Sequence, residues 1–158
     1  MSMIGNFLQI SPAQLHEAIE DPTMIESLLD TESDSQDAID VDKAWHAIHY
    51  MLTNSAWEGD EPLANAVLGG TAIGDDVGYG PAKYITSAQV KDVAAKLPNR
   101  ELLKTAFDGN AMTTEEIYPE IWDEGSDALD YILEYYDSMK SFFMDAASRG
   151  NAMLKYLN

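Results

Sequence analysis

The stretch S-D-A-L-D-Y-I-L-E-Y-Y-D-S-M-K-S-F-F-M-D-A-A-S-R, residues 126–149, decides the fold of this chain. Apolar side chains recur in it every three or four positions, which is the spacing of one face of an α-helix. A helix of this length extends about 36 Å. Gly150 follows where helices commonly end, so the sequence predicts one long helix near the C-terminus. The apolar residues of this face are Leu129, Ile132, Tyr136, Met139, Phe143 and Ala146.

Short apolar segments lie near both ends of the chain. M-I-G-N-F-L-Q-I, residues 3–10, is rich in strand-forming residues and predicts a buried strand. Residues 152–157, after the long helix, are apolar enough for a last strand, and we expect this strand to pair with the first. The sequence therefore predicts a single helix-rich α+β domain over residues 1–158, with a small sheet that includes the N- and C-terminal strands.

Shorter helices are expected between the two terminal strands. Ser11 followed by Pro12, and Asp21 followed by Pro22, each form a helix-start pattern of a capping side chain and then proline. The further helical segments are residues 43–53 after a cap at Asp40 or Asp42, residues 62–68, a helix through Leu97 after a cap at Thr86 or Ser87, and residues 100–107. The buried face of the first of these contains Val41, Ala44, Trp45, Ile48, Met51 and Leu52.

The remaining segments are predicted to be loops and turns. Residues 31–37 are polar and should form an exposed break. Residues 69–81 carry five glycines and are expected to be a long loop, followed by a brief strand at Tyr84 and Ile85. Residues 113–119 are expected to form a turn that ends at a proline.

The charge of the chain is unevenly distributed. Residues 1–42 and 105–139 each contain ten carboxylates and neither lysine nor arginine, and the whole chain has a formal net charge of -19. Such a surface repels phosphate and anionic membranes and attracts cationic partners. We therefore expect a basic protein partner, and neither nucleic acid nor membrane. The alternative is that the acidity serves solubility alone.

The composition excludes several classes of protein. There is no cysteine, which excludes a disulfide scaffold, cysteine-bound zinc and thiol catalysis. No signal peptide is visible, and no apolar stretch reaches the roughly 20 residues needed to cross a bilayer. A cytoplasmic protein is expected.

Two groups of side chains are candidates for a functional site. Exposed Asp34, Asp37 and Asp40, with Tyr79 in the glycine-rich loop, are candidate contacts for a protein partner. A pocket is the other candidate, in which His49 would act as a base beside an aromatic platform. Its candidate residues are Asp42, Trp45, His49, Tyr118 and Trp122, with Tyr79 as a further lining residue.

A purely structural role is the alternative for the pocket candidates. Trp45 would then belong to the core and Asp42 would cap the helix. His49 would be a histidine at the rim, bonded to a backbone carbonyl, while His46 would point further toward solvent.

No motif predicts a catalytic residue, a metal or a cofactor. His46 and His49 lie three residues apart without the H-E-x-x-H pattern, and the aspartates of residues 34–42 lack the glycine and glutamate of a calcium-binding loop. The glycine-rich segment lacks the Gly-Lys-Ser/Thr ending of a phosphate loop, and no Gly-x-Ser-x-Gly nucleophile motif is present.

Several segments along almost the whole chain resemble a known family. In order, they are M-S-M-I-G-N-F (residues 1–7), D-V-D-K-A-W-H-A-I-H (40–49), P-L-A-N-A-V-L-G-G (62–70), G-Y-G-P-A-K-Y-I-T (78–86), E-I-Y-P-E-I-W (116–122) and R-G-N-A-M-L (149–154). Together they are similar to the bacterial YfbM-like family, a domain of unknown function. The resemblance implies a small cytosolic α+β domain without an established activity, and no catalytic residue carries over. Some relatives are thought to act as immunity partners of bacterial toxins.

Two functions therefore remain open. The first is a non-enzymatic acidic binding protein, such as an immunity protein that binds and occludes a basic bacterial toxin. The alternative is a small-molecule-binding protein, or an enzyme of unknown reaction, that uses the aromatic pocket described above. The sequence indicates no oligomeric state.

Overall fold

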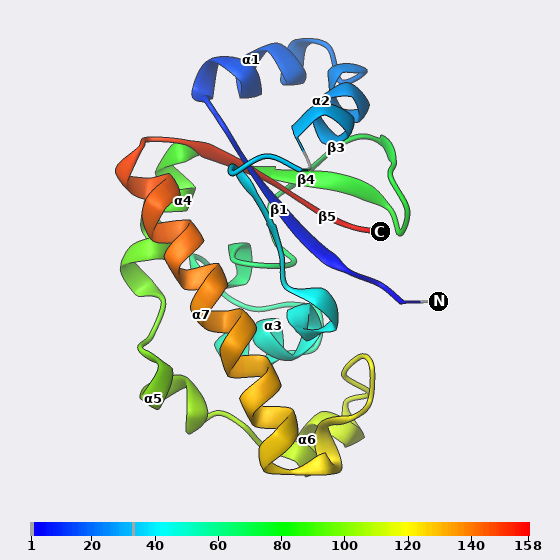
Figure 1. The fold of residues 1–158 in the computed structure, drawn as a ribbon, viewed down its shortest axis with the longest axis vertical. Helices are drawn as coiled ribbons and strands as arrows, with labels where there is room; N and C mark the ends of the chain where they lie inside the picture. Colours follow the sequence, from blue (N-terminus) through cyan, green and yellow to red (C-terminus); the bar gives the residue numbers. More distant parts are fainter. Residues whose placement is uncertain (1, 33) are drawn as a thin grey trace.

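One antiparallel sheet joins segments from the whole length of the chain. The computed structural model describes residues 2–32 and 34–158, and these residues form five strands in the order β2-β1-β5-β4-β3 (Figure 1). The strands are β1 (Gly5–Ile10), β2 (Ala38–Asp40), β3 (Thr71–Asp76), β4 (Pro81–Ile85) and β5 (Ala152–Leu157).

The two terminal strands pair with each other, as predicted. Gly5 lies opposite Leu157 and Ile10 lies opposite Ala152, so β1 and β5 match over their full length. These two strands occupy the middle of the sheet, and their buried side chains belong to the cores on both faces. The predicted α+β fold with a small sheet built from both termini is confirmed.

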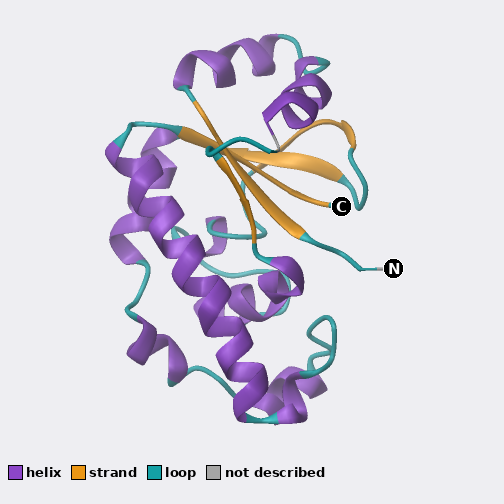
Figure 2. Cartoon of the chain, viewed as in Figure 1, coloured by secondary structure: helices purple, strands orange, loops and turns teal. Residues whose placement is uncertain are grey.

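Helices cover both faces of this sheet (Figure 2). On one face lie α1 (Pro12–Glu20) and α2 (Met24–Glu32), which pack on Leu8, Ile10 and Leu154. The other face carries the larger core and the remaining helices. They are α3 (Trp45–Thr53), α4 (Ser87–Lys96), α5 (Arg100–Lys104), α6 (Gly109–Thr114) and α7 (Ser126–Ser148).

The prediction of one long C-terminal helix is confirmed. Helix α7 runs without interruption from Ser126 to Ser148, and Gly150 after it has a φ of 69°, the left-handed conformation that ends many helices. Its apolar stripe faces the core, except that Leu129 is only partly buried. Among the described residues, no helix combines the length and apolar character that crossing a membrane requires.

Two helix starts follow the predicted capping chemistry. The Ser11 hydroxyl accepts a hydrogen bond from the Gln14 amide (3.1 Å), while the Ser11 amide donates to the Gln14 side chain (2.9 Å). Thr86 and Gln89 form the same reciprocal pair at the start of α4. Each pair satisfies two amide groups that the first helical turn leaves without partners.

Three predictions for local structure were wrong. The expected loop at residues 69–81 contains strand β3, and strand β2, which was not predicted, follows the polar segment that ends at Asp37. Both are edge strands that pair through backbone groups, so they form with few buried side chains. The predicted turn at residues 113–119 begins inside α6, and residues 62–68 form only the 3-10 turn Leu63–Asn65.

The predicted cap at Asp40 or Asp42 was also wrong. Helix α3 begins at Trp45, after the 3-10 turn Asp42–Ala44, and no side chain caps it. The Asp42 carboxylate instead accepts a hydrogen bond from the Tyr131 hydroxyl of α7 (2.7 Å). The Asp42 carboxylate, which the sequence pattern assigned to capping α3, therefore binds a residue of α7 instead.

Candidate functional site

Trp45 is a core residue at the start of α3. Its side chain is fully buried, and the indole N–H donates to the carbonyl of Met3 (2.9 Å). The ring stacks on Tyr118, with 5.6 Å between the ring centres, and on His46 at 5.0 Å. Burial of Trp45 agrees with the structural alternative for this residue.

His46 does not point toward solvent, which corrects the expectation from the helical wheel. The side chain is fully buried, and its Nδ1 accepts a hydrogen bond from the Tyr118 amide (2.8 Å). The proton must then sit on Nε2, which donates to the carbonyl of Ala56 (2.8 Å). Burial lowers the pKa of His46, so the ring is a neutral connector between α3 and two loops.

His49 makes the expected bond to a backbone carbonyl, but it is buried and does not lie at a rim. Its Nε2 donates to the carbonyl of Glu58 (2.8 Å), and the side chain is 1% exposed. Within the described part of the chain, Nδ1 has no hydrogen-bond partner. Burial lowers the pKa of His49 to about 4, and the positive charges of Lys155 and Lys83 act in the same direction. His49 is therefore neutral near pH 7.

The five pocket candidates do not converge on one cavity. Trp45 and Tyr118 stack on each other, whereas Trp122 donates to the carbonyl of Ile117 (3.0 Å) and stacks on Tyr131, the residue that binds Asp42. None of the five lines either of the two cavities described below. These residues connect α3, α7 and the loops between them.

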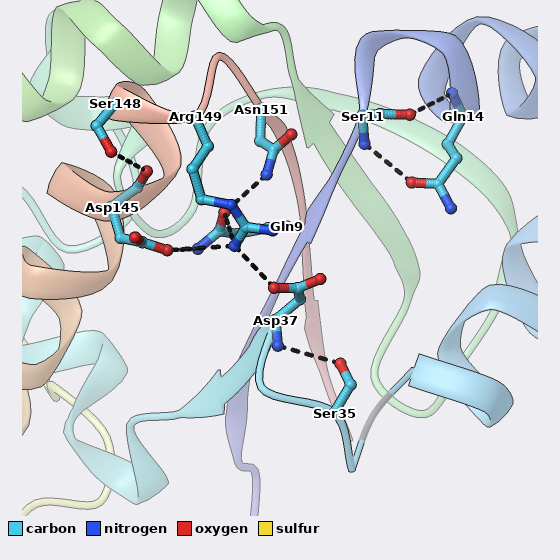
Figure 3. A network of polar contacts seen from close by, with 9 residues as sticks. All are labelled: Gln9, Ser11, Gln14, Ser35, Asp37, Asp145, Ser148, Arg149 and Asn151. Atoms are coloured by element: carbon cyan, nitrogen blue, oxygen red, sulfur yellow. Dashed lines mark hydrogen bonds and ion pairs between the residues drawn. The ribbon is translucent and has the colours of Figure 1, made fainter.

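The aspartates near β2 differ in whether a side chain of the same protein already binds their carboxylate. Asp37 is held by Arg149, whose guanidinium lies 2.8 Å from its carboxylate and also contacts Asp145 (3.3 Å) and Gln9 (Figure 3). The Asp40 carboxylate accepts from the amide of Asp42 (3.0 Å) but remains exposed.

Asp34 and Tyr79 lie in different segments beside the sheet. Asp34 is exposed, and its charge adds to the burial that raises the pKa of Tyr156. Tyr79 is 41% exposed on the turn between β3 and β4, and its amide donates to the carbonyl of Leu157. Asp34 precedes β2 at one edge of the sheet, and Tyr79 follows β3 at the other edge.

Two lysines face each other on the inner face of the sheet, which the sequence did not lead us to expect. Lys83 of β4 lies directly opposite Lys155 of β5, and both are on the α3 side with Phe7. The Lys155 ammonium donates to the carbonyls of Asn65 (2.5 Å) and Gly69 (2.6 Å). Lys83 donates to the carbonyl of Leu68 (2.7 Å).

Glycines at 69 and 70 let the chain bring these carbonyls to the lysines. A Cβ atom on Gly69 would lie 2.6 Å from the carbonyl oxygen of Ala64, and Gly70 has a φ of +109°, which side chains disfavour. The carbonyls of Asn65, Leu68 and Gly69 therefore point toward β4 and β5. They bind the two ammonium groups in place of carboxylates.

A cavity of about 230 Å³ lies over these lysines, and we call it the lysine cleft. Burial lowers the pKa of Lys155 well below its ordinary value, and the like charge of Lys83 adds to this effect. A lysine within the apolar segment A-M-L-K-Y-L (residues 152–157) was the one signal in the sequence. The cleft is lined by residues 5–7, Trp57, Val67, Leu68, residues 79–81, Lys83 and residues 155–157.

A second cavity, of about 470 Å³, lies on the α2 side of the sheet. Two of its carboxylates, Glu26 and Asp30, project from α2, and two more, Asp75 and Asp76, come from the end of β3. Apolar residues such as Ile25 and Leu29 line the same cavity, and its lining contains neither lysine nor arginine. We call this cavity the acidic hollow. Its acids are about fifty residues apart in sequence, so no local pattern could reveal it.

The described residues contain no cluster of three or more histidine and acidic side chains arranged to hold a metal ion. The two cavities have opposite charge and could each bind a different kind of charged group. The acidic hollow suits a cation, and the lysine cleft suits an anion.

Comparison with known proteins supports the fold and leaves the activity open. No curated protein matches the chain. The crystal structure of YfbM from Escherichia coli, a protein of unknown function, superposes with a TM-score of 0.74 at 22% sequence identity, covering 98% of this chain and 99% of the other. The family model described as Domain of unknown function (DUF1877) matches residues 1–156. The chain therefore belongs to this family of domains of unknown function.

Proposed function

We propose that this protein is a non-enzymatic binding protein that takes up a basic protein partner on its acidic surface. An immunity protein that occludes a bacterial toxin would act in this way. The acidic hollow is the observation that supports the proposal most directly. It combines four carboxylates with an apolar lining, in a chain with a net charge of -19.

The hollow has the chemistry that a lysine or arginine side chain requires. The charged end of such a side chain pairs with carboxylates, while its methylene stem packs against apolar atoms. Glu26 and Asp30 are exposed on α2, one helical turn apart, where an incoming cation meets them first. The acidic surface around the hollow would increase the association rate by roughly 10–1,000-fold at low salt.

The structure favours the hollow over the loop at residues 34–37 as the main contact. Asp37 is already paired with Arg149 of the same chain, so a partner would have to compete with that guanidinium. Asp34 and Asp40 remain exposed and can contribute to steering. Occlusion of the partner's basic cleft, rather than any reaction, would be the mechanism.

Charge reversal at the hollow tests this proposal. The variant Glu26→Lys/Asp30→Lys should weaken binding of the basic partner captured from the native host and slow its association. The matched control is Asp130→Lys/Glu134→Lys, which reverses two exposed acids at the same spacing on α7 and changes the net charge equally. Folding of both variants is checked by circular dichroism.

The outcomes separate a specific site from general acidity. A larger loss of affinity in the α2 variant than in the α7 variant supports the hollow. Equal losses would mean that only the total charge matters. A captured partner that is acidic, or an association rate that does not change with salt, would refute the proposal.

A further inference from the structure

The two lysines of the lysine cleft have no acidic partner in the described chain. Lysine is almost never fully buried unless it is paired, yet Lys155 is 4% exposed. Among the described residues, the ion pairs of this protein involve neither Lys155 nor Lys83. Two like charges directly opposite each other on neighbouring strands also destabilise a sheet. Carbonyl groups satisfy the ammonium donors only in part.

The described residues supply acceptors for only some of the donors on both lysines. An ammonium group has three N–H donors and no acceptor. Lys155 uses two of them on the carbonyls of Asn65 and Gly69, and Lys83 uses one on the carbonyl of Leu68. One donor on Lys155 and two on Lys83 have no acceptor among the described residues, and the two lysines lie side by side on adjacent strands. An anion with two oxygen atoms matches this pair of groups.

The walls of the cleft are apolar, and its rim is aromatic. Phe7 and Leu68 contribute to the walls, while Trp57 (63% exposed) and Tyr79 (41% exposed) reach the solvent. A cavity of about 230 Å³ lies below the roughly 300–1,000 Å³ of typical ligand pockets, which restricts the occupant to a small molecule.

We propose that the lysine cleft binds a small organic carboxylate, with its anionic end at Lys83 and Lys155 and its apolar or aromatic body between Phe7, Leu68 and Trp57. The site lies on the opposite face of the sheet from the acidic hollow, and Tyr156 lines both cavities. The proposal does not depend on the basic partner. A carboxylate bound there would supply an acidic partner to buried Lys155 and partly buried Lys83, which have none among the described residues.

The charged groups that line the cleft favour a small anion over a cation or an uncharged molecule of the same size. His49 is neutral and adds no further positive charge near pH 7. The lining of the cleft contains no carboxylate side chain, so a bound anion meets no direct repulsion there. A cation would meet two ammonium groups, and an uncharged molecule would leave their charges uncompensated.

The competing explanation is that the lysines only hold the turn at residues 65–69. Titration with benzoate, benzamide and benzylammonium separates the two, because these probes share a ring and differ in charge. Amide resonances of Leu68 and Gly80, recorded by NMR, report occupancy of the cleft, and the Trp57 indole resonance reports its rim. We expect saturable shifts with benzoate, at least roughly tenfold weaker binding of benzamide, and no effect of benzylammonium at these resonances.

The variant Lys83→Met removes the charge and one bond to the turn, from Lys83 to the Leu68 carbonyl, but keeps the two bonds that Lys155 makes to the turn. It should weaken benzoate binding by roughly tenfold or more while the other amide resonances keep their positions. The matched control Lys91→Met removes an exposed lysine of α4 and should leave the affinity unchanged. Equal affinities for benzoate and benzamide, or a Lys83→Met variant that binds benzoate like the parent, would overturn the proposal and leave the lysines a structural role.

Discussion

Trp45 provides the sharpest test of the core. The variant Trp45→Ala removes a fully buried indole, its stacking on Tyr118 and His46, and the donor to the carbonyl of Met3. Truncation of a buried tryptophan costs about 3–5 kcal/mol, because a cavity remains where the ring was. Each kcal/mol shifts the melting temperature of a domain of this size by roughly 2–4 °C, so we expect a decrease of about 6–20 °C.

Urea unfolding followed by circular dichroism measures this loss, and Trp57→Ala is the matched control. Trp57 is 63% exposed but its ring centre lies 4.3 Å from that of His46, so its truncation should lower the free energy of unfolding by no more than about 1.5 kcal/mol. Trp45→Phe keeps most of the buried area and should fall between the two. If Trp45→Ala unfolds at the same urea concentration as the parent, the indole is not a core residue and its assignment is wrong.

Two further predictions concern a buried histidine and a close turn. The ring of His49 should remain neutral down to about pH 4, whereas in the unfolded chain it takes up a proton near pH 6.5. Stability should therefore fall as the pH is lowered between these values, by up to roughly 1.4 kcal/mol per pH unit from this group, and an NMR titration of the ring near pH 6.5 would contradict it. Gly69→Ala should destabilise the domain by about 1–3 kcal/mol, because the new Cβ would lie 2.6 Å from the carbonyl oxygen of Ala64. An unchanged urea midpoint for Gly69→Ala would show that the turn at residues 64–69 can relax.

Local signals in the sequence were sufficient where one segment specifies its own geometry. The repeat in α7 gives one side of a helix an apolar face wherever that helix packs. Ser11 and Thr86 cap their helices because the groups that they satisfy lie within the next turn. The terminal strands were predicted from their short apolar runs, and their pairing is confirmed.

Edge strands escaped prediction because backbone groups, and not side chains, hold them in place. Most residues of β3 are exposed, and only Ile73 is buried. Its polar, glycine-containing sequence is typical of a loop. It becomes a strand because its backbone groups pair with those of β4. Composition alone does not distinguish such a strand from a loop.

Burial of the two histidines depends on segments that lie elsewhere in the chain. A helical wheel places His46 and His49 outside the main apolar face of α3. Other segments of the chain cover that side of the helix. His46 bonds to the carbonyl of Ala56 and the amide of Tyr118, and His49 bonds to the carbonyl of Glu58. The spacing of apolar residues in α3 cannot indicate that these distant segments bury the two histidines.

By itself, the sequence determined the family, the α+β class, the long helix and the acidity of the surface. Only the tertiary structure decided which charges meet. It pairs Asp37 with Arg149, gathers Glu26 and Asp30 with Asp75 and Asp76, and places Lys83 opposite Lys155. The physical reason is that helix periodicity and capping act over a few residues, whereas the pairing of strands and the neutralisation of charge depend on partners far apart along the chain.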